Sequence, residues 1–204
     1  MKKKKFNKGL TLTALGSFWW GVIGVIYFKY ISFAGPIEVV IHRCIWTSAM
    51  LILTTFYFSK WNIFFEIISN KKKIVILFFS GLLIFINWST WIYAVSTEKI
   101  IDASFGYFIM PILSVFLGYV FYNEKINTKR GISILLVLIS ILFLILVNFN
   151  SIPWVGIIVA LSWGFYNLLR KKVNVDTDVG LLIESLFILP FALFAFYLIF
   201  KNNL

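Results

Sequence analysis

The chain has 204 residues, of which 61% are hydrophobic and 13% are charged. A soluble domain of this size does not need so much apolar surface, and several apolar runs reach about 18 residues, enough for a helix to cross a bilayer. The net charge of +11 comes from short basic clusters between these runs, which is typical of cytoplasmic loops and not of a nucleic-acid surface. We therefore expect an all-α polytopic membrane protein in contact with the lipid bilayer and without a nucleic-acid partner.

About seven membrane-spanning helices are expected. The basic segment Met1–Lys8 is expected to be unstructured. A basic start before an apolar run also describes a signal peptide, but the run from Gly9 to about Ile31 is too long for one, so it is interpreted as an uncleaved first helix. The later helices are expected at about residues 36–58, 74–95, 102–122, 131–147, 154–169 and 180–200, with a short surface helix at 61–68 and a polar turn at 148–153.

The distribution of basic residues predicts the orientation. Most lysines and arginines fall in the N-terminal segment and in the loops on the same side, whereas Lys29, Lys99 and Lys201 fall near the opposite ends of the helices. Positively charged loops remain in the cytoplasm. We expect a cytoplasmic N-terminus and, from the abundance of Ile, Phe, Lys and Asn, a bacterial inner (plasma) membrane.

Two helices resemble each other. Residues 17–21, Ser-Phe-Trp-Trp-Gly, can be laid over residues 160–164, Ala-Leu-Ser-Trp-Gly. Five helices separate the two starts, so the copies cross the membrane in opposite directions, and inverted repeats are typical of transporters. Chance similarity between two tryptophan-bearing helices is the alternative.

Polar and aromatic side chains within the predicted helices are the candidates for a substrate path. Small and hydroxyl residues pack helices and aromatic residues anchor at membrane interfaces, which is the competing interpretation. Asn87 needs a polar partner at its depth. The predicted path residues are Trp20, Tyr27, His42, Arg43, Asn87, Trp91, Tyr107, Trp163 and Asn167.

The second helix holds the only histidine beside an arginine. Glu38 and His42 are four residues apart and share a face, and Glu184 occupies the roughly opposite position in the second repeat. One interpretation is that Arg43 reaches up to the outer interface while His42 packs against a neighbour. The other places Arg43 on a cavity, where it attracts an anionic group, and makes Glu38, His42 and Glu184 candidates for proton coupling.

Catalysis and metal binding are not indicated. Cys44 is the only cysteine and His42 the only histidine, which excludes an internal disulfide and argues against a metal site. No nucleophile lies beside a base in the sequence. We expect no enzyme activity and no cofactor.

Several motifs that span the chain belong together: residues 38–46 (Glu-Val-Val-Ile-His-Arg-Cys-Ile-Trp), Asn87-Trp88, residues 103–111, Tyr166 with Arg170-Lys171-Lys172, Leu182-Ile183-Glu184 and Leu189-Pro190. In their order and spacing they resemble a known family, the RarD-type permeases of the EamA group in the drug/metabolite transporter superfamily. The resemblance implies an inner-membrane permease of ten helices in two inverted five-helix repeats, without a prosthetic group. It further implies that a small metabolite or drug moves by alternating access.

The chain departs from that pattern by ending after the seventh expected helix. Residues 1–150 would form the first repeat and residues 151–204 the first two helices of an incomplete second one. A fragment, a second chain that supplies three further helices, or a homodimer would explain the difference. The alternative function is a non-transporting membrane subunit.

Overall fold

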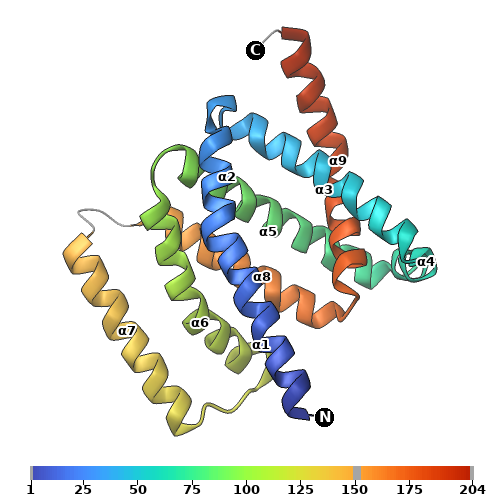
Figure 1. Cartoon of the computed structure of the whole chain (residues 1–204). Helices are drawn as coiled ribbons and strands as arrows, with labels where there is room; N and C mark the ends of the chain where they lie inside the picture. The colour runs from blue at the N-terminus through green and yellow to red at the C-terminus, as the bar shows by residue number, and fades with distance from the viewer. Residues whose placement is uncertain (1, 149–152, 203–204) are drawn as a thin grey trace.

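The computed structural model describes residues 2–148 and 153–202, and all regular elements in these ranges are helices (Figure 1). This confirms the all-α fold. The elements are α1 (Lys2–Phe18), the π-helix η1 (Trp19–Gly24), α2 (Val25–Tyr30), the 3₁₀-helix η2 (Ile31–Ala34), α3 (Pro36–Tyr57), α4 (Trp61–Ile68), α5 (Lys71–Ser96), α6 (Ile100–Tyr122), α7 (Thr128–Asn148), α8 (Trp154–Val173) and α9 (Thr177–Asn202).

Six of these stretches are long and apolar enough to cross a membrane. They are Gly9–Ala34, Pro36–Tyr57, Lys71–Ser96, Ile100–Tyr122, Thr128–Val147 and Thr177–Lys201. The expected span over 154–169 corresponds to α8, whose 20 residues end in Arg170, Lys171 and Lys172; it is not among the six. The protein is thus polytopic, as predicted, with α8 as the least apolar of its long helices.

Two details of the prediction change. The basic N-terminal segment is helical from Lys2 instead of unstructured, which agrees with the good helix propensity of lysine. The polar turn expected at 148–153 falls largely outside the described residues.

The first span bends through three kinds of helix before it meets α3. A π-turn at Trp19–Gly24 interrupts it, and a 3₁₀ turn ends it. Gly35 then adopts a φ of 77°, which glycine tolerates without the penalty of a Cβ. Pro36 follows at the first turn of α3, where its missing N–H costs nothing.

Helix α5 lies at the centre of the packing. It contacts α8, α9, α3 and α6, and α8 also packs along α6 while α9 crosses α3. Figure 1 shows α8 running behind α6 and α1, and α7 standing at the edge of the molecule, where it packs on α6. The core cluster is built around Ile84, Trp88 and Ile92 of α5 with Val155 and Val159 of α8.

Burial differs sharply between the helices. The most apolar windows of α5 and α9 are 39% and 44% buried, whereas those of Gly9–Ala34 and of Thr128–Val147 are only 6% buried. The first span and α7 therefore offer most of their surface to lipid or to another protein.

Two glycines allow α6 and α8 to approach closely. A Cβ on Gly156 would overlap the carbonyl oxygen of Asp102, and one on Gly106 would overlap the carbonyl oxygen of Gly156. Small residues at such crossings let the helix backbones pack directly in membranes.

Replacing Gly156 by alanine should therefore destabilise the protein by about 1–3 kcal/mol, because the added methyl group forces α6 and α8 apart. The matched control is Gly131→Ala in α7, where a Cβ meets nothing within 4 Å and the better helix propensity of alanine should be neutral or stabilising. Thermal unfolding in detergent measures both. Equal midpoints for the two variants would contradict the close packing of α6 on α8.

Candidate functional site

Arg43 lies two turns into α3 and is surrounded by aromatic rings. Its guanidinium carbon is 4.4 Å from the ring centroid of Trp88 and 5.3 Å from those of Trp20 and Phe28. Trp91 closes the group, with ring centroids 5.1 Å from Trp20 and 5.2 Å from Phe28. Cation–π contacts of this length stabilise a charge that has left water. We call Arg43 with these four aromatic residues the arginine cage.

One hydrogen-bond donor of the arginine cage has no partner within the described residues. The Nη1 atom of Arg43 is buried and has no hydrogen-bond partner among residues 2–148 and 153–202, nor does any carboxylate there pair with this guanidinium. Tyr107 of α6 packs against the same core cluster. A buried guanidinium normally pairs with an acceptor, and Nη1 of Arg43 has none within the described residues.

A pocket of about 500 Å³ opens beside the cage, between the end of the first span and α3. Its lining residues are Tyr27, Phe28, Ile31, Phe33, Ala34, Glu38, Val39, His42, Arg43, Trp46 and Thr47. The Oε1 atom of Glu38 lies 3.9 Å from Nε2 of His42, and both side chains are about two-fifths exposed. We call this space the outer pocket.

Glu184 lies in a separate cluster and is fully buried. Ser80 of α5 donates its hydroxyl to Oε1 at 2.5 Å, Tyr166 of α8 donates to Oε2 at 3.2 Å, and Nη1 of Arg170 lies 3.6 Å from Oε1. Gly180 makes room for Arg170, since a Cβ there would overlap the guanidinium. The carboxylate is satisfied by its neighbours and ties α5, α8 and α9 together.

Asn87 joins two helices and is not part of the outer pocket. It is 4% exposed, and its amide donates to the carbonyl oxygen of Val159 at 3.2 Å and to Oγ of Ser162 at 3.1 Å. Trp163 stacks on Tyr166, with ring centroids 5.4 Å apart. These α8 contacts supply the polar partner that the position of Asn87 required.

Asn167 lies in a different pocket, of about 410 Å³, shared with Tyr122, Glu124 and Lys171. Lys171 donates to Glu124 at 2.6 Å and lies 4.3 Å from the Tyr122 ring. This hydrogen bond holds the pKa of the Glu124 carboxyl below its ordinary value. The pocket belongs to the ends of α6 and α8 that carry the basic loops.

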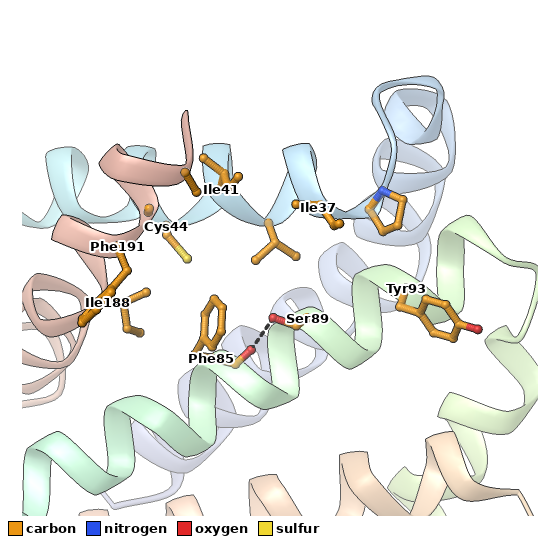
Figure 2. Close-up of a pocket in the computed structure, with 12 residues that line it drawn as sticks. Ile37, Ile41, Cys44, Phe85, Ser89, Tyr93, Ile188 and Phe191 are labelled. Carbon is orange, nitrogen blue, oxygen red and sulfur yellow. Dashed lines mark hydrogen bonds between the residues drawn. The ribbon is translucent and has the colours of Figure 1, made fainter. Parts of the chain in front are cut away.

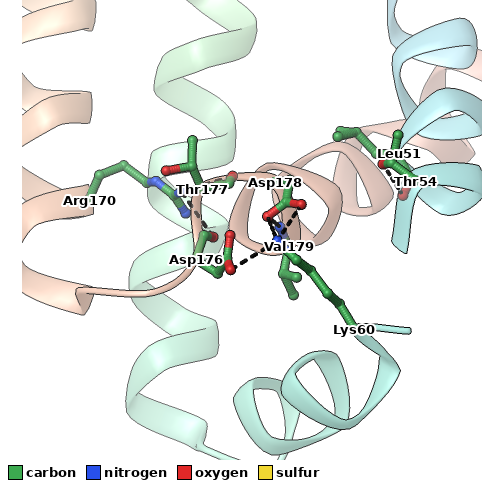
Figure 3. A network of polar contacts seen from close by, with 8 residues as sticks. All are labelled: Leu51, Thr54, Lys60, Arg170, Asp176, Thr177, Asp178 and Val179. Atoms are coloured by element: carbon green, nitrogen blue, oxygen red, sulfur yellow. Dashed lines mark hydrogen bonds and ion pairs between the residues drawn. The ribbon is translucent and has the colours of Figure 1, made fainter. Parts of the chain in front are cut away.

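A second set of ion pairs joins α3 to α9 near that end. Lys60, just after α3, donates to Asp178 at 2.7 Å and to Asp176 at 3.0 Å (Figure 3). Hydrogen bonds to Asp178 and then Asp176 raise the pKa of Lys60. Arg170 donates from Nη2 to the carbonyl oxygen of Thr177 at 3.1 Å. These contacts fix the turn between α8 and α9 against the rest of the protein.

An apolar pocket of about 400 Å³ lies between α3, α5 and α9 (Figure 2). Cys44 and Ile41 line it from α3, and Ile188 lines it from α9. Ser89 also lines it, but its hydroxyl donates a hydrogen bond to the carbonyl oxygen of Phe85 at 2.8 Å. Such a lining suits a hydrocarbon group and not a charged one. Within the described residues there is no group of His, Cys, Asp and Glu able to hold a metal ion.

The structure divides the predicted path and proton-coupling residues among four places. Trp20, Arg43 and Trp91 meet in the arginine cage, and Tyr27, Glu38 and His42 meet with Arg43 in the outer pocket. Asn87, Trp163 and Glu184 lie in the α5–α8–α9 contacts, and Asn167 lies in the pocket at the other end.

Phe28, Trp88 and Ser80 were not predicted as site residues from the sequence. Phe28 and Trp88 directly follow Tyr27 and Asn87, which were proposed, and point about 100° away from them on the helix. The spacing of polar and aromatic residues in the sequence does not tell which of two neighbouring helix faces lines the site. Ser80 gives no signal of its own, because its role depends on Glu184 more than 100 positions later.

Six apolar helices of spanning length, packed together through buried polar groups, define a multi-pass membrane protein. The EamA-like transporter family model matches residues 7–146, and the chain belongs to this family.

Bacterial relatives agree with the assignment. The chain is 36% identical over 193 residues to an uncharacterized transporter of Vibrio cholerae, covering 95% of this chain and 63% of the relative. It is 31% identical over 206 residues to the uncharacterized transporter YojE of Bacillus subtilis, covering 100% of this chain and 68% of the relative. It is 33% identical over 192 residues to protein RarD of Escherichia coli, covering 94% of this chain and 64% of the relative. The chain therefore spans about two thirds of the length of these relatives. No solved structure matches it.

The buried Glu184 cluster leads to a stability prediction. Glu184→Gln should cost about 3 kcal/mol, because it leaves Arg170 without its carboxylate in a buried setting. Glu66→Gln is the matched control, since Glu66 is 76% exposed and lies 3.9 Å from Lys73, and exposed pairs contribute little. Unfolding in mixed detergent gives both values. A Glu184 variant as stable as the Glu66 variant would disprove the buried pairing.

The Glu124–Lys171 pair leads to a pH prediction. The pKa of Glu124 is lowered in the folded protein, so the pair stabilises above the ordinary carboxyl value of 4.5 and this contribution is lost as the pH falls through the lowered pKa. Lys171→Gln should therefore lower the unfolding temperature at pH 7, and the difference from wild type should shrink as the pH falls below 4.5 and through the lowered pKa of Glu124. Lys125→Gln removes an exposed charge without this partner and should show no such pH dependence; a constant difference for Lys171→Gln would contradict the pairing.

Proposed function

We propose that the chain forms the core of a bacterial inner-membrane permease that moves a small metabolite or drug. Membership of the EamA-like transporter family and the transporter names of the relatives support this reading. The observation that carries it is a guanidinium kept inside the helix bundle on the wall of a pocket of about 500 Å³. Ionisable groups inside membrane proteins are costly and commonly mark transport paths.

The proposed path begins at the outer pocket and the arginine cage. With the N-terminus in the cytoplasm, as the basic loops predict, the outer pocket faces the periplasm and the Lys60 and Lys171 ion pairs lie at the cytoplasmic end. Residues 1–150 form the first repeat and residues 151–204 begin the inverted second one. Transport by alternating access then requires the contacts of Lys60 with Asp176 and Asp178 to break when the cytoplasmic end opens.

Proton coupling is proposed for the groups that face the outer pocket and for Glu184. Glu38 and His42 are half-exposed and 3.9 Å apart, so a proton on the imidazole strengthens their pairing. Glu184 joins α5 of the first repeat to α8 and α9 of the second. Protonation of the Glu184 carboxylate would weaken its ion pair with Arg170 and loosen the contact between the repeats.

A second candidate function is a membrane subunit that does not transport alone. The first span is only 6% buried in its most apolar part, which favours this function. On that side the cage is covered by the first span alone, and the outer face of this span is left for a partner. The proposed partner is a chain that supplies further helices or a second copy of this one. It would cover the first span and complete the path.

The test is uptake of labelled small metabolites into proteoliposomes that contain the 204-residue chain. Arg43→Ala and Tyr107→Ala should each lower the rate about tenfold, the effect of roughly 1.4 kcal/mol, because Arg43 is the cation of the cage and Tyr107 packs against the same core cluster. Phe143→Ala on the exposed face of α7, with Phe143 at 64% exposure, is the control and should leave the rate unchanged.

Unchanged uptake in both the Arg43 and the Tyr107 variants would refute the proposed path. An inactive wild-type chain that becomes active only with an added helical partner would support the second candidate instead.

A further inference from the structure

We propose that the outer pocket binds a small organic monoanion, with its carboxylate on Arg43 and its apolar body against the surrounding aromatic and aliphatic side chains. This inference deepens the proposed function by naming the substrate class. It rests on that function only in treating the bound anion as cargo.

The first step is the state of the guanidinium. Aromatic rings stabilise the charge of Arg43 through their π-faces, but they accept no strong hydrogen bond from its N–H groups. Nη1 is buried and unpaired within the described parts of the chain. An arginine carries five donors in a planar fork that matches the two oxygens of a carboxylate. An oxyanion is therefore the partner that would satisfy this group.

The second step is the absence of an internal competitor. Glu184, the fully buried carboxylate, is already held by Ser80, Tyr166 and Arg170. Glu38 lies on the wall of the same pocket but is directed to His42, 3.9 Å away. Among residues 2–148 and 153–202, no ion pair occupies Arg43, in contrast to Arg170, so its charge remains available to a ligand.

The third step is the size and polarity of the pocket. A volume of about 500 Å³ falls within the range of small-molecule sites. Phe28, Ile31, Phe33 and Trp46 give it a mainly apolar wall, which suits a hydrocarbon or aryl body and not a fully hydrated ion.

Glu38 adds selectivity between anions. Its carboxylate stands on the pocket wall, so a second negative group on the ligand would meet like charge at short range, which is unfavourable. A monocarboxylate avoids this contact. We therefore expect monocarboxylates to bind more tightly than dicarboxylates of the same length.

The same oxyanion chemistry could come from a lipid headgroup, since the pocket lies within a membrane protein. The two sources differ in one observable property. A headgroup would occupy the site in bilayers of anionic lipid and compete with a soluble ligand there, whereas a soluble carboxylate would bind equally well in neutral and anionic bilayers.

The experiment measures binding of 3-phenylpropionate and of its neutral amide to the 204-residue chain in phosphatidylcholine nanodiscs. The carboxylate should bind about tenfold or more tightly than the amide, which corresponds to about 1.4 kcal/mol. Arg43→Gln should remove this preference, and Arg43→Lys should restore only part of it because the bidentate fork is lost.

The matched control is Lys29→Gln. Lys29 is a cation at the same end of the molecule, its side chain is 61% exposed, and it pairs with Glu98 at 3.3 Å. Losing it changes the net charge as Arg43→Gln does but should leave the carboxylate preference intact. A loss of preference in the Lys29 variant as well would show general charge attraction and overturn the site.

The remaining outcomes are each decisive. Equal binding of acid and amide to the wild type overturns the proposal, and this comparison stands even if Arg43→Gln fails to fold. Competition by phosphatidylglycerol that is abolished in Arg43→Gln assigns the site to the lipid headgroup and overturns the proposal of a soluble substrate. A preserved carboxylate preference without uptake in proteoliposomes keeps the binding site and rejects transport by this chain alone, so the two failures are distinguishable.

Discussion

The arrangement depends on one helix that carries two buried polar side chains to its neighbours. Ser80 and Asn87 are seven positions apart on α5 and thus lie on one face, two turns from each other. Ser80 bonds to Glu184 of α9, and Asn87 bonds to Ser162 and the Val159 carbonyl of α8. In hydrocarbon, such groups must be satisfied by other parts of the protein, and this requirement fixes α8 and α9 against α5.

The rest of the bundle follows from that contact. With α9 in place, α3 packs across it and presents Arg43 to the other side of α5, where Trp88 and Trp91 stand. The two arginines inside the bundle, Arg170 and Arg43, thus have different kinds of partner. Arg170 has a carboxylate and backbone carbonyls as partners, which is a structural role. Arg43 lies beside a pocket and has aromatic rings, but no carboxylate partner within the described residues, and for this reason we propose a binding site there.

The fold class and the helix positions could be predicted because apolar runs of spanning length are visible in the sequence. The meeting of Glu38, His42 and Arg43 at one pocket could also be expected, since they share one helix. The separation of Asn87 and Glu184 from that pocket could not, because it depends on how α8 and α9 turn their faces toward α5. The prediction of an unstructured N-terminal segment was wrong, because α1 begins at Lys2 and lysine is compatible with a helix. The low apolarity of α8 was partly visible in its three terminal basic residues.

The measurement that tests the account most directly is the accessibility of the outer pocket from the periplasmic side. Thr47 lines this pocket, so Thr47→Cys should react with a membrane-impermeant thiol reagent added to intact cells. Native Cys44, which is 1% exposed, should stay unreactive and serves as the internal control. The account predicts that labelling occurs from outside and slows when 3-phenylpropionate is present. Labelling only in inverted vesicles, or labelling that the carboxylate does not affect, would contradict it.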